Sequence, residues 1–139
     1  MGLILDSSVL IAAERERLNW IGWQETLRNE SQFITVITLS ELWHGWHKAQ
    51  SQEQRARRER FIRSIETRFP ILGIGVAEAR VHARLWSELS SAGQLIGAHD
   101  LLIAAITLTH GHRLATLNRS EFSRVPELEI LEMGSFVRE

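Results

Sequence analysis

Cysteine is absent from this chain of 139 residues, which excludes disulfide bonds and thiolate metal sites. Lysine is nearly absent, because Lys48 is the only one and arginine supplies almost all the positive charge. No apolar run approaches the roughly 20 residues that cross a bilayer. The apolar stretch near the N-terminus is interrupted by Asp6 and by the charged residues 14–17, which is unlike a signal peptide. We therefore expect a cytoplasmic protein without a membrane segment.

Charge is balanced overall but unevenly distributed. The formal net charge of −1 argues against a generally cationic nucleic-acid binder. Six arginines nevertheless fall between Arg55 and Arg68. Their planar guanidinium groups suit phosphate and carboxylate partners, which would make this segment a docking strip. The alternative is a solvated helix face on which the arginines pair with Glu53, Glu59 and Glu66.

The organisation of the chain indicates one domain over residues 1–139, because no repeat, low-complexity segment or Pro/Gly-rich linker divides it. Apolar and β-branched runs predict strands, with a possible fifth near the C-terminus: 2–6, 32–38, 71–75, 113–117 and 128–133. Apolar residues at helical spacing predict helices at 18–30, 39–50, 51–69, 76–93 and 99–111. Strands that alternate with helices indicate an α/β fold with a parallel sheet covered on both faces.

Acidic and amide side chains occur where these strands end. Asp6 comes directly after the first strand, and Glu41 falls in the first helical turn after the second. Asp100 begins the buried helix before the fourth strand, and Asn118 and Glu121 follow that strand. Parallel sheets bind ligands at the carboxyl ends of their strands, so these five residues are the candidate site.

Helix capping is the alternative explanation for each of these residues taken alone. Asp, Asn, Ser and Thr are the preferred N-cap residues. The segment from Thr38 to Glu41 fits a capping box, and the segment from Asn118 to Glu121 resembles one. Asp100 could equally cap its helix and interact with the helix dipole.

Convergence of the carboxylates would have a chemical consequence. If Asp6, Glu41 and Asp100 lie within a few ångströms, protonation or a cation must relieve their repulsion. Oxygen ligands without cysteine favour Mg²⁺ or Mn²⁺, and such ions can activate water and stabilise the leaving oxygen of a phosphodiester. Carboxylates without a phosphate loop suit hydrolysis of a nucleic-acid backbone better than nucleotide handling.

Four segments carry a family resemblance. "LILDSSVLIA", "ITLSELWHG", "GAHDLLIAAITLTHG" and "LATLNRSEF" resemble, in order and spacing, the motifs of PIN-domain ribonucleases, and most closely the VapC-like toxins of bacterial type II toxin–antitoxin modules. The resemblance implies a three-layer α/β/α domain with a central parallel sheet of four to five strands. It also implies a magnesium-dependent endoribonuclease that hydrolyses RNA, a cognate antitoxin partner, and a homodimer or a toxin–antitoxin hetero-oligomer.

The resemblance also assigns roles to the candidate residues. Asp6, Glu41 and Asp100 match the three acidic positions of the family, and Asp6 and Asp100 match the usual metal ligands. Asn118 stands where many members carry a fourth acidic residue, whereas other members have asparagine there and an acidic residue three places on, which Glu121 matches. A neutral Asn118 favours a one-ion site over a two-ion site.

Histidine and tryptophan offer weaker candidates. His44 and His47, like His110 and His112, could share a metal, but neither pair has an obvious third ligand. Of the five tryptophans, most are expected in the core. An exposed ring in the 39–50 helix could stack on an RNA base or anchor a partner. The helix 18–30 and the arginine-rich helix are candidate antitoxin contacts.

Three functions follow from these patterns. The first is the metal-dependent endoribonuclease toxin. The second is a catalytically inactive PIN-like module that only binds protein or RNA. The third is a metal phosphohydrolase that acts on small nucleotides.

Overall fold

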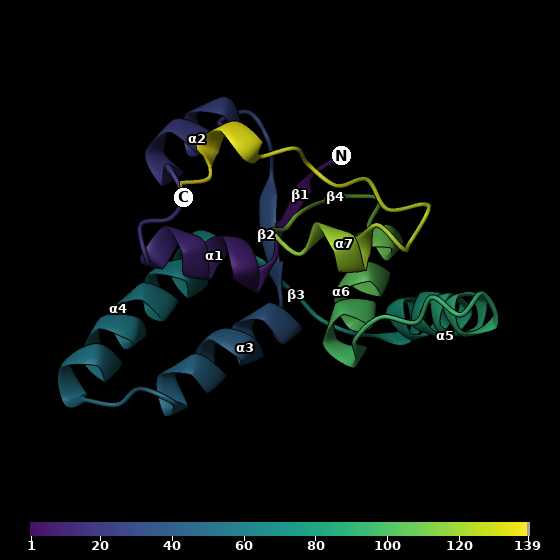
Figure 1. Ribbon diagram of the computed structural model, residues 1–139, viewed down its shortest axis with the longest axis horizontal. Coiled ribbons are helices and arrows are strands. Elements are labelled where there is room, and N and C mark those ends of the chain that lie inside the picture. Colours follow the sequence, from purple (N-terminus) through teal and green to yellow (C-terminus); the bar gives the residue numbers. More distant parts are fainter. Residues whose placement is uncertain (139) are drawn as a thin grey trace.

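The computed structural model describes residues 1–138 and contains one parallel sheet between two layers of helices (Figure 1). Its four strands are hydrogen-bonded in the order β3-β2-β1-β4, and every pairing is parallel. The strands are short: β1 (Leu3–Leu5), β2 (Gln32–Thr35), β3 (Ile71–Leu72) and β4 (Arg113–Ala115). The predicted three-layer α/β/α fold is confirmed.

Helices cover both faces of this sheet. One layer contains α1 (Ser7–Glu14), α2 (Trp20–Thr26), α3 (Val36–His47) and α4 (Gln52–Arg68), and the other contains α5 (Val76–Ser91), α6 (Ala98–Thr109) and the short α7 (Arg119–Phe122) (Figure 1). A 3₁₀ helix, η1 (Gly134–Phe136), contacts α2. No helix within residues 1–138 has the length and apolar character that a membrane span requires.

The core has two halves because side chains alternate across a strand. Leu3 and Leu5 of β1 pack among the residues of α1 to α4, whereas Ile4 packs among those of α5 to α7. All three side chains are completely buried. Continuous apolar strands are expected where helices cover both sheet faces, and this arrangement leaves the strand ends as the accessible polar edge.

The second strand is shorter than predicted, and the following helix begins earlier. The sequence predicted a strand over 32–38, but β2 ends at Thr35 and α3 begins at Val36. Thr35 is the N-cap of α3, and its hydroxyl accepts a hydrogen bond from the Thr38 amide at 3.1 Å. This cap overrides the β propensity of the branched residues that follow it. Glu41 consequently lies in the second turn of α3, and the predicted capping box from Thr38 to Glu41 is wrong.

The predicted fifth strand is only a single bridge. Ile130 pairs in parallel with Leu114, whose amide donates to Glu129 and whose carbonyl accepts from Leu131. The backbone groups of the two residues flanking Leu114 in β4 face β1 instead. Since β4 has three residues, it offers only one residue to a strand on its outer edge. The sheet therefore has four strands.

Candidate functional site

Asp6 is a buried carboxylate at the end of β1, with 4% of its surface exposed. Its Oδ2 atom accepts hydrogen bonds from the hydroxyls of Ser8 and Thr116, both at 2.8 Å. Asp6 occupies the N-cap position of α1 but makes no side-chain capping bond there. Its carboxylate is thus held by two hydroxyls, and both bonds go to one oxygen, so Oδ1 is the atom available to a ligand.

The same hydroxyls tie the loop after β4 to the start of α1. The Ser8 hydroxyl accepts from the amide of Leu117 at 3.0 Å, and the Thr116 hydroxyl accepts from the amide of Asn118 at 3.0 Å. Thr116 is buried and lies beside β1 because β4 is the neighbouring strand. Sequence reasoning missed Ser8 and Thr116. Ser8 is the second residue of α1 and Thr116 directly follows β4, so only the pairing of β1 with β4 brings their hydroxyls together.

Glu41 reaches the site from α3 and is held from two sides. Its Oε1 atom accepts a hydrogen bond from the Ser7 hydroxyl at 3.0 Å. Its Oε2 atom lies 3.5 Å from Nδ1 of His99, at the start of α6. Three helices therefore meet around this carboxylate, which makes no capping bond in its own helix.

Asp100 is the third residue of α6, whose N-cap position is occupied by Gly97. The Asn118 side-chain amide donates to Oδ2 of Asp100 at 3.0 Å. Partial burial raises the pKa of Asp100 to about 6, and the charges of Asp6, Glu121 and Glu41 contribute to the rise, while the Asn118 bond opposes it. The structure thus brings the candidate carboxylates close enough to repel one another.

Glu121 has a structural contact that the sequence did not predict. Its Oε1 atom accepts a hydrogen bond from the amide of Gly97 at 2.7 Å, so Glu121 of α7 satisfies a donor at the start of α6. Asn118 is the N-cap residue of α7 but makes no side-chain capping bond, so the predicted capping box from Asn118 to Glu121 does not form. These two residues instead support the first turn of α6, which carries Asp100.

The donor chemistry of the site fits a hard divalent cation. Asp6 and Asp100 are the only aspartates of the chain, and both lie here. Within residues 1–138, no three His, Asp or Glu side chains converge closely enough to form a complete metal-binding group. Mg²⁺ keeps several waters and binds through one or two carboxylates, so the two aspartates match its needs, whereas a closed protein cage does not form.

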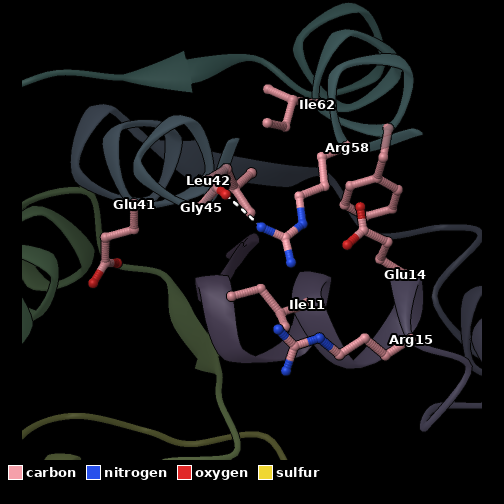
Figure 2. A pocket seen from close by; sticks show the side chains of 9 residues that line it. Ile11, Glu14, Arg15, Glu41, Leu42, Gly45, Arg58 and Ile62 are labelled. Atoms are coloured by element: carbon pink, nitrogen blue, oxygen red, sulfur yellow. Dashed lines mark hydrogen bonds between the residues drawn. The ribbon is translucent and has the colours of Figure 1, made fainter. Parts of the chain in front are cut away.

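Two hollows adjoin Glu41. One is open, has a volume of about 520 Å³, and is lined by Ser40, Glu41, His44 and His99. The other, of about 60 Å³, lies between α1, α3 and α4, where Ile11, Leu42, Phe61 and Ile62 provide apolar walls. Figure 2 shows that Arg58 crosses this second groove and donates to the Gly45 carbonyl, at 2.5 Å, with Arg15 on the opposite wall.

The tryptophans of α3 are not the exposed rings that base stacking requires. Trp43 and Trp46 are partly buried against the core, and the guanidinium groups of Arg63 and Arg55 cover them at 5.6 and 5.0 Å. The pair between Arg63 and Glu59 agrees with the solvated-face interpretation, whereas the contacts of Arg55 and Arg63 with the tryptophan rings were not part of it. Trp86 of α5, which the sequence did not single out, is 54% exposed.

Comparison with known proteins identifies a family. A model described as PIN domain matches residues 3–128. The chain is 37% identical over 131 residues to Ribonuclease VapC of Rickettsia bellii (strain RML369-C), and the match covers 94% of this chain and 96% of that protein.

Solved structures agree with this match. A chain of VapBC2 from Rickettsia felis, bound to a promoter DNA fragment, superposes with a TM-score of 0.86 at 26% identity over 94% of this chain and 98% of that chain. VapBC-5 from Mycobacterium tuberculosis, a member of the VapBC family of toxin–antitoxin systems, gives a TM-score of 0.75 at 26% identity over 100% of both chains. The chain therefore belongs to the PIN-domain family and, within it, to the VapC proteins.

Proposed function

We propose that this protein is the ribonuclease toxin of a toxin–antitoxin pair and that it hydrolyses RNA phosphodiester bonds at the Asp6 and Asp100 carboxylates. The observation that carries the proposal is that Asp6 at the end of β1 and Glu41 of α3 lie near enough to Asp100 at the start of α6 for their charges to add to the effect of burial in raising the pKa of Asp100. The name of the Rickettsia bellii relative supports the nuclease activity, and the VapBC structures support an antitoxin partner.

A divalent cation is part of this proposal. Asp6 and Asp100 would hold Mg²⁺, or Mn²⁺, through the oxygens that face the site. When bound, the ion would neutralise the carboxylates, lower the pKa of water and polarise the phosphate. The neutral Asn118 favours one ion over two, since an amide donates to Asp100 where a fourth carboxylate would add ligand charge.

The chain's own residues hold the reacting groups in place. The hydroxyls of Ser8 and Thr116 fix Asp6, the Asn118 amide fixes Asp100, and Glu121 supports the helix start that carries Asp100. Glu41 is left to orient the attacking water and to accept its proton, because Ser7 engages Oε1 and leaves Oε2 toward the open hollow. Its proximity to His99 would restrain the rotation of this carboxylate.

The antitoxin is proposed to inhibit by occupying the groove beside Glu41. The groove between α1, α3 and α4 combines apolar walls with Arg15 and Arg58 (Figure 2), and Glu41 lines both this groove and the hollow beside His99. Apolar side chains of the partner would fill the walls, and a basic side chain would approach the carboxylates. Such an assembly would be a toxin–antitoxin hetero-oligomer, built on a homodimer of this chain and located in the cytoplasm.

The test is cleavage of RNA by the pure protein with Mg²⁺, beside Asp6→Asn, Asp100→Asn and the control Glu25→Gln. Glu25 is an exposed carboxylate on α2 outside the site. Wild type and control should cleave equally, and both aspartate variants should lose activity by at least about 100-fold, since each loses a proposed metal ligand. Equal activity in all four proteins would refute the proposal.

Two further measurements separate the other functions. Titration with Mn²⁺ should show binding to the wild type and not to Asp6→Asn. No ion binding together with no cleavage would instead identify a binding module. Turnover of a small phosphodiester without cleavage of RNA would identify a phosphohydrolase of small nucleotides.

A further inference from the structure

The exposed ring of Trp86 lies on a second stripe of α5, beside the stripe that packs into the core. Leu85 and Leu89 of this helix are buried, whereas Trp86 is 54% exposed. His82 stands four residues before Trp86, which places both rings on one helix face. Their centroids are 5.8 Å apart, with planes tilted by 54°. Two flat side chains are thus presented together to solvent.

These rings form one wall of an open hollow of about 260 Å³. The loop between α5 and α6 and the first turns of α6 form the rest of it, through Leu95, Ile96, Ala98 and Leu101. Leu95 is itself 46% exposed. The lining is therefore apolar and aromatic, and it is open on the side of the rings.

The first turn of α6 separates this hollow from the acidic site. Ala98 and Leu101 line the hollow, whereas His99 lines the opposite hollow with Glu41, and Asp100 lies between them in the chain. The two sites are therefore on adjacent faces of one helical turn.

A basic side chain stands at the rim of this hollow. Arg124 follows α7, is exposed, and donates from Nη1 to the carbonyl of Leu95 at 2.9 Å. A guanidinium has five N–H donors, so this bond to the loop fixes its position and leaves donors for an anion. The loop itself is fixed at its other end by the bond from Gly97 to Glu121.

We propose that this hollow binds a nucleobase of single-stranded RNA, next to the phosphodiester that is cleaved, with the base stacked on Trp86 and a backbone phosphate on Arg124. The inference rests on the proposed ribonuclease function and specifies how that site holds its substrate. Single-stranded RNA exposes base faces that stack on aromatic side chains, and such stacking is largely independent of base sequence.

The charge of the protein favours stacking, rather than electrostatic attraction, as the mode of binding. The chain has a net charge of −1, and the cleavage site is a cluster of carboxylates that repels phosphate. Electrostatic attraction, which dominates binding in cationic nucleic-acid proteins, is therefore weak here. Stacking supplies affinity that does not depend on net charge, and a single arginine at the rim is enough to orient one phosphate.

The experiment measures binding of a labelled ten-nucleotide single-stranded RNA by fluorescence anisotropy. All variants carry Asp6→Asn, so that no cleavage occurs during the measurement. Trp86→Ala should raise Kd by about tenfold or more, the usual loss when a stacking ring is removed. Trp86→Phe should retain most of the affinity, and Arg124→Gln should reduce the dependence of Kd on salt. Val76→Ala, an exposed apolar residue on the same helix outside the hollow, is the control and should bind as the parent does.

A second probe is the same RNA with one abasic nucleotide, placed at successive positions. One position should weaken binding to the parent but leave binding to Trp86→Ala unchanged, because that variant has already lost the stacking contact. A circular dichroism spectrum and melting temperature like those of the parent show that the variants fold. If Trp86→Ala is unstable, the test is the RNA affinity of Trp86→Phe and the salt dependence of Kd for Arg124→Gln.

Three outcomes would overturn the base pocket. Unchanged RNA affinity of folded Trp86→Ala is the first. The second is a change of oligomeric state in sedimentation with RNA affinity retained, which would assign the hollow to a second copy of this chain. The third is loss of antitoxin binding with RNA affinity retained. A Trp86-dependent affinity in a protein whose wild type cleaves no RNA would instead uphold the pocket and refute the nuclease.

Discussion

Replacing Asp100 by asparagine is expected to stabilise the metal-free protein while removing its activity. The side chain keeps its shape, and the new amide oxygen can still accept the hydrogen bond from Asn118. What disappears is a charge that the fold disfavours, because the pKa of Asp100 rises from its usual 3.8 to about 6 through burial and through its acidic neighbours. The same repulsion is what a bound cation would relieve.

The magnitude follows from linkage between proton binding and folding. A rise from 3.8 to about 6 corresponds to about 3 kcal/mol, at about 1.36 kcal/mol per pKa unit. Asp100 is only partly buried, so solvent screening reduces this to about 1 kcal/mol. The folded state binds the proton more tightly than the unfolded state, so the wild type loses this stability as pH rises from about 4 to about 6. The variant has no such loss.

The assay is urea unfolding with EDTA at pH 7.5 and at pH 3.8. Asp100→Asn should exceed the wild type by about 1 kcal/mol at pH 7.5, and the difference should shrink markedly at pH 3.8, where the wild-type carboxyl is mostly protonated in the folded state. Millimolar Mg²⁺ at pH 7.5 should then stabilise the wild type and not the variant. Glu25→Gln serves as the control. A variant that is less stable than the wild type at pH 7.5, or a difference that does not depend on pH, would refute the reasoning.

Substitutions at three other positions test the hydrogen bonding, packing and titration of buried side chains. Thr116→Val removes a buried donor to Asp6 and should cost about 1–3 kcal/mol in urea unfolding, whereas Thr116→Ser keeps the hydroxyl and should cost less. Phe122→Ala empties a fully buried position and should cost about 3–5 kcal/mol in the same assay. Burial lowers the pKa of His112, and the positive charges of His110 and the N-terminal amine lower it further. The unfolded state therefore binds a proton more tightly than the folded state, so the free energy of unfolding should fall as pH drops below about 6.5. His112→Gln should weaken that dependence in melting curves at pH 5 and pH 7.5.

The sequence predicted the fold class well because burial on both sheet faces leaves a strong pattern. The apolar run of Leu3–Leu5 became β1. The helices α5 and α6 end two residues before their predicted ends, and the glycines at those predicted ends, Gly93 and Gly111, have positive φ of +67° and +66°. The boundary at Thr35 was missed because β-branched residues occur in strands and in helices alike. Only the capping bond between Thr35 and Thr38 decides between them.

The positions of the candidate site were predictable, but its contacts were not. Asp6 and Asp100 follow from the rule that ligands bind at the carboxyl ends of parallel strands. The hydroxyl of Thr116, by contrast, meets Asp6 across 110 residues, and the carboxylate of Glu121 meets Gly97 across 24. Such pairings depend on strand order and on the loop after β4, which no local pattern encodes. The exposure of Trp86, by contrast, follows from helical spacing, since it lies beside the stripe of Leu85 and Leu89 that packs into the core.

The N-cap residues of the helices bear on the choice between capping and chemistry. Three helices use a side chain of their N-cap residue: Asn19 for α2, Thr35 for α3 and Ser51 for α4. Glycine occupies the N-cap position of α5 and α6, whereas Asp6 of α1 and Asn118 of α7 have side chains that could cap and make no such bond.

Capping by a side chain is worth about 1 kcal/mol, so leaving Asp6 and Asn118 out of it has a cost. Asn118 binds Asp100 instead, and Asp6 accepts from two hydroxyls. The side chains of Asp6 and Asn118, which could cap these helices, instead take part in the hydrogen bonds that hold the carboxylates of Asp6 and Asp100 in place. A fold selected for stability alone would use them as caps, and their use elsewhere supports our proposal that these residues belong to a functional site.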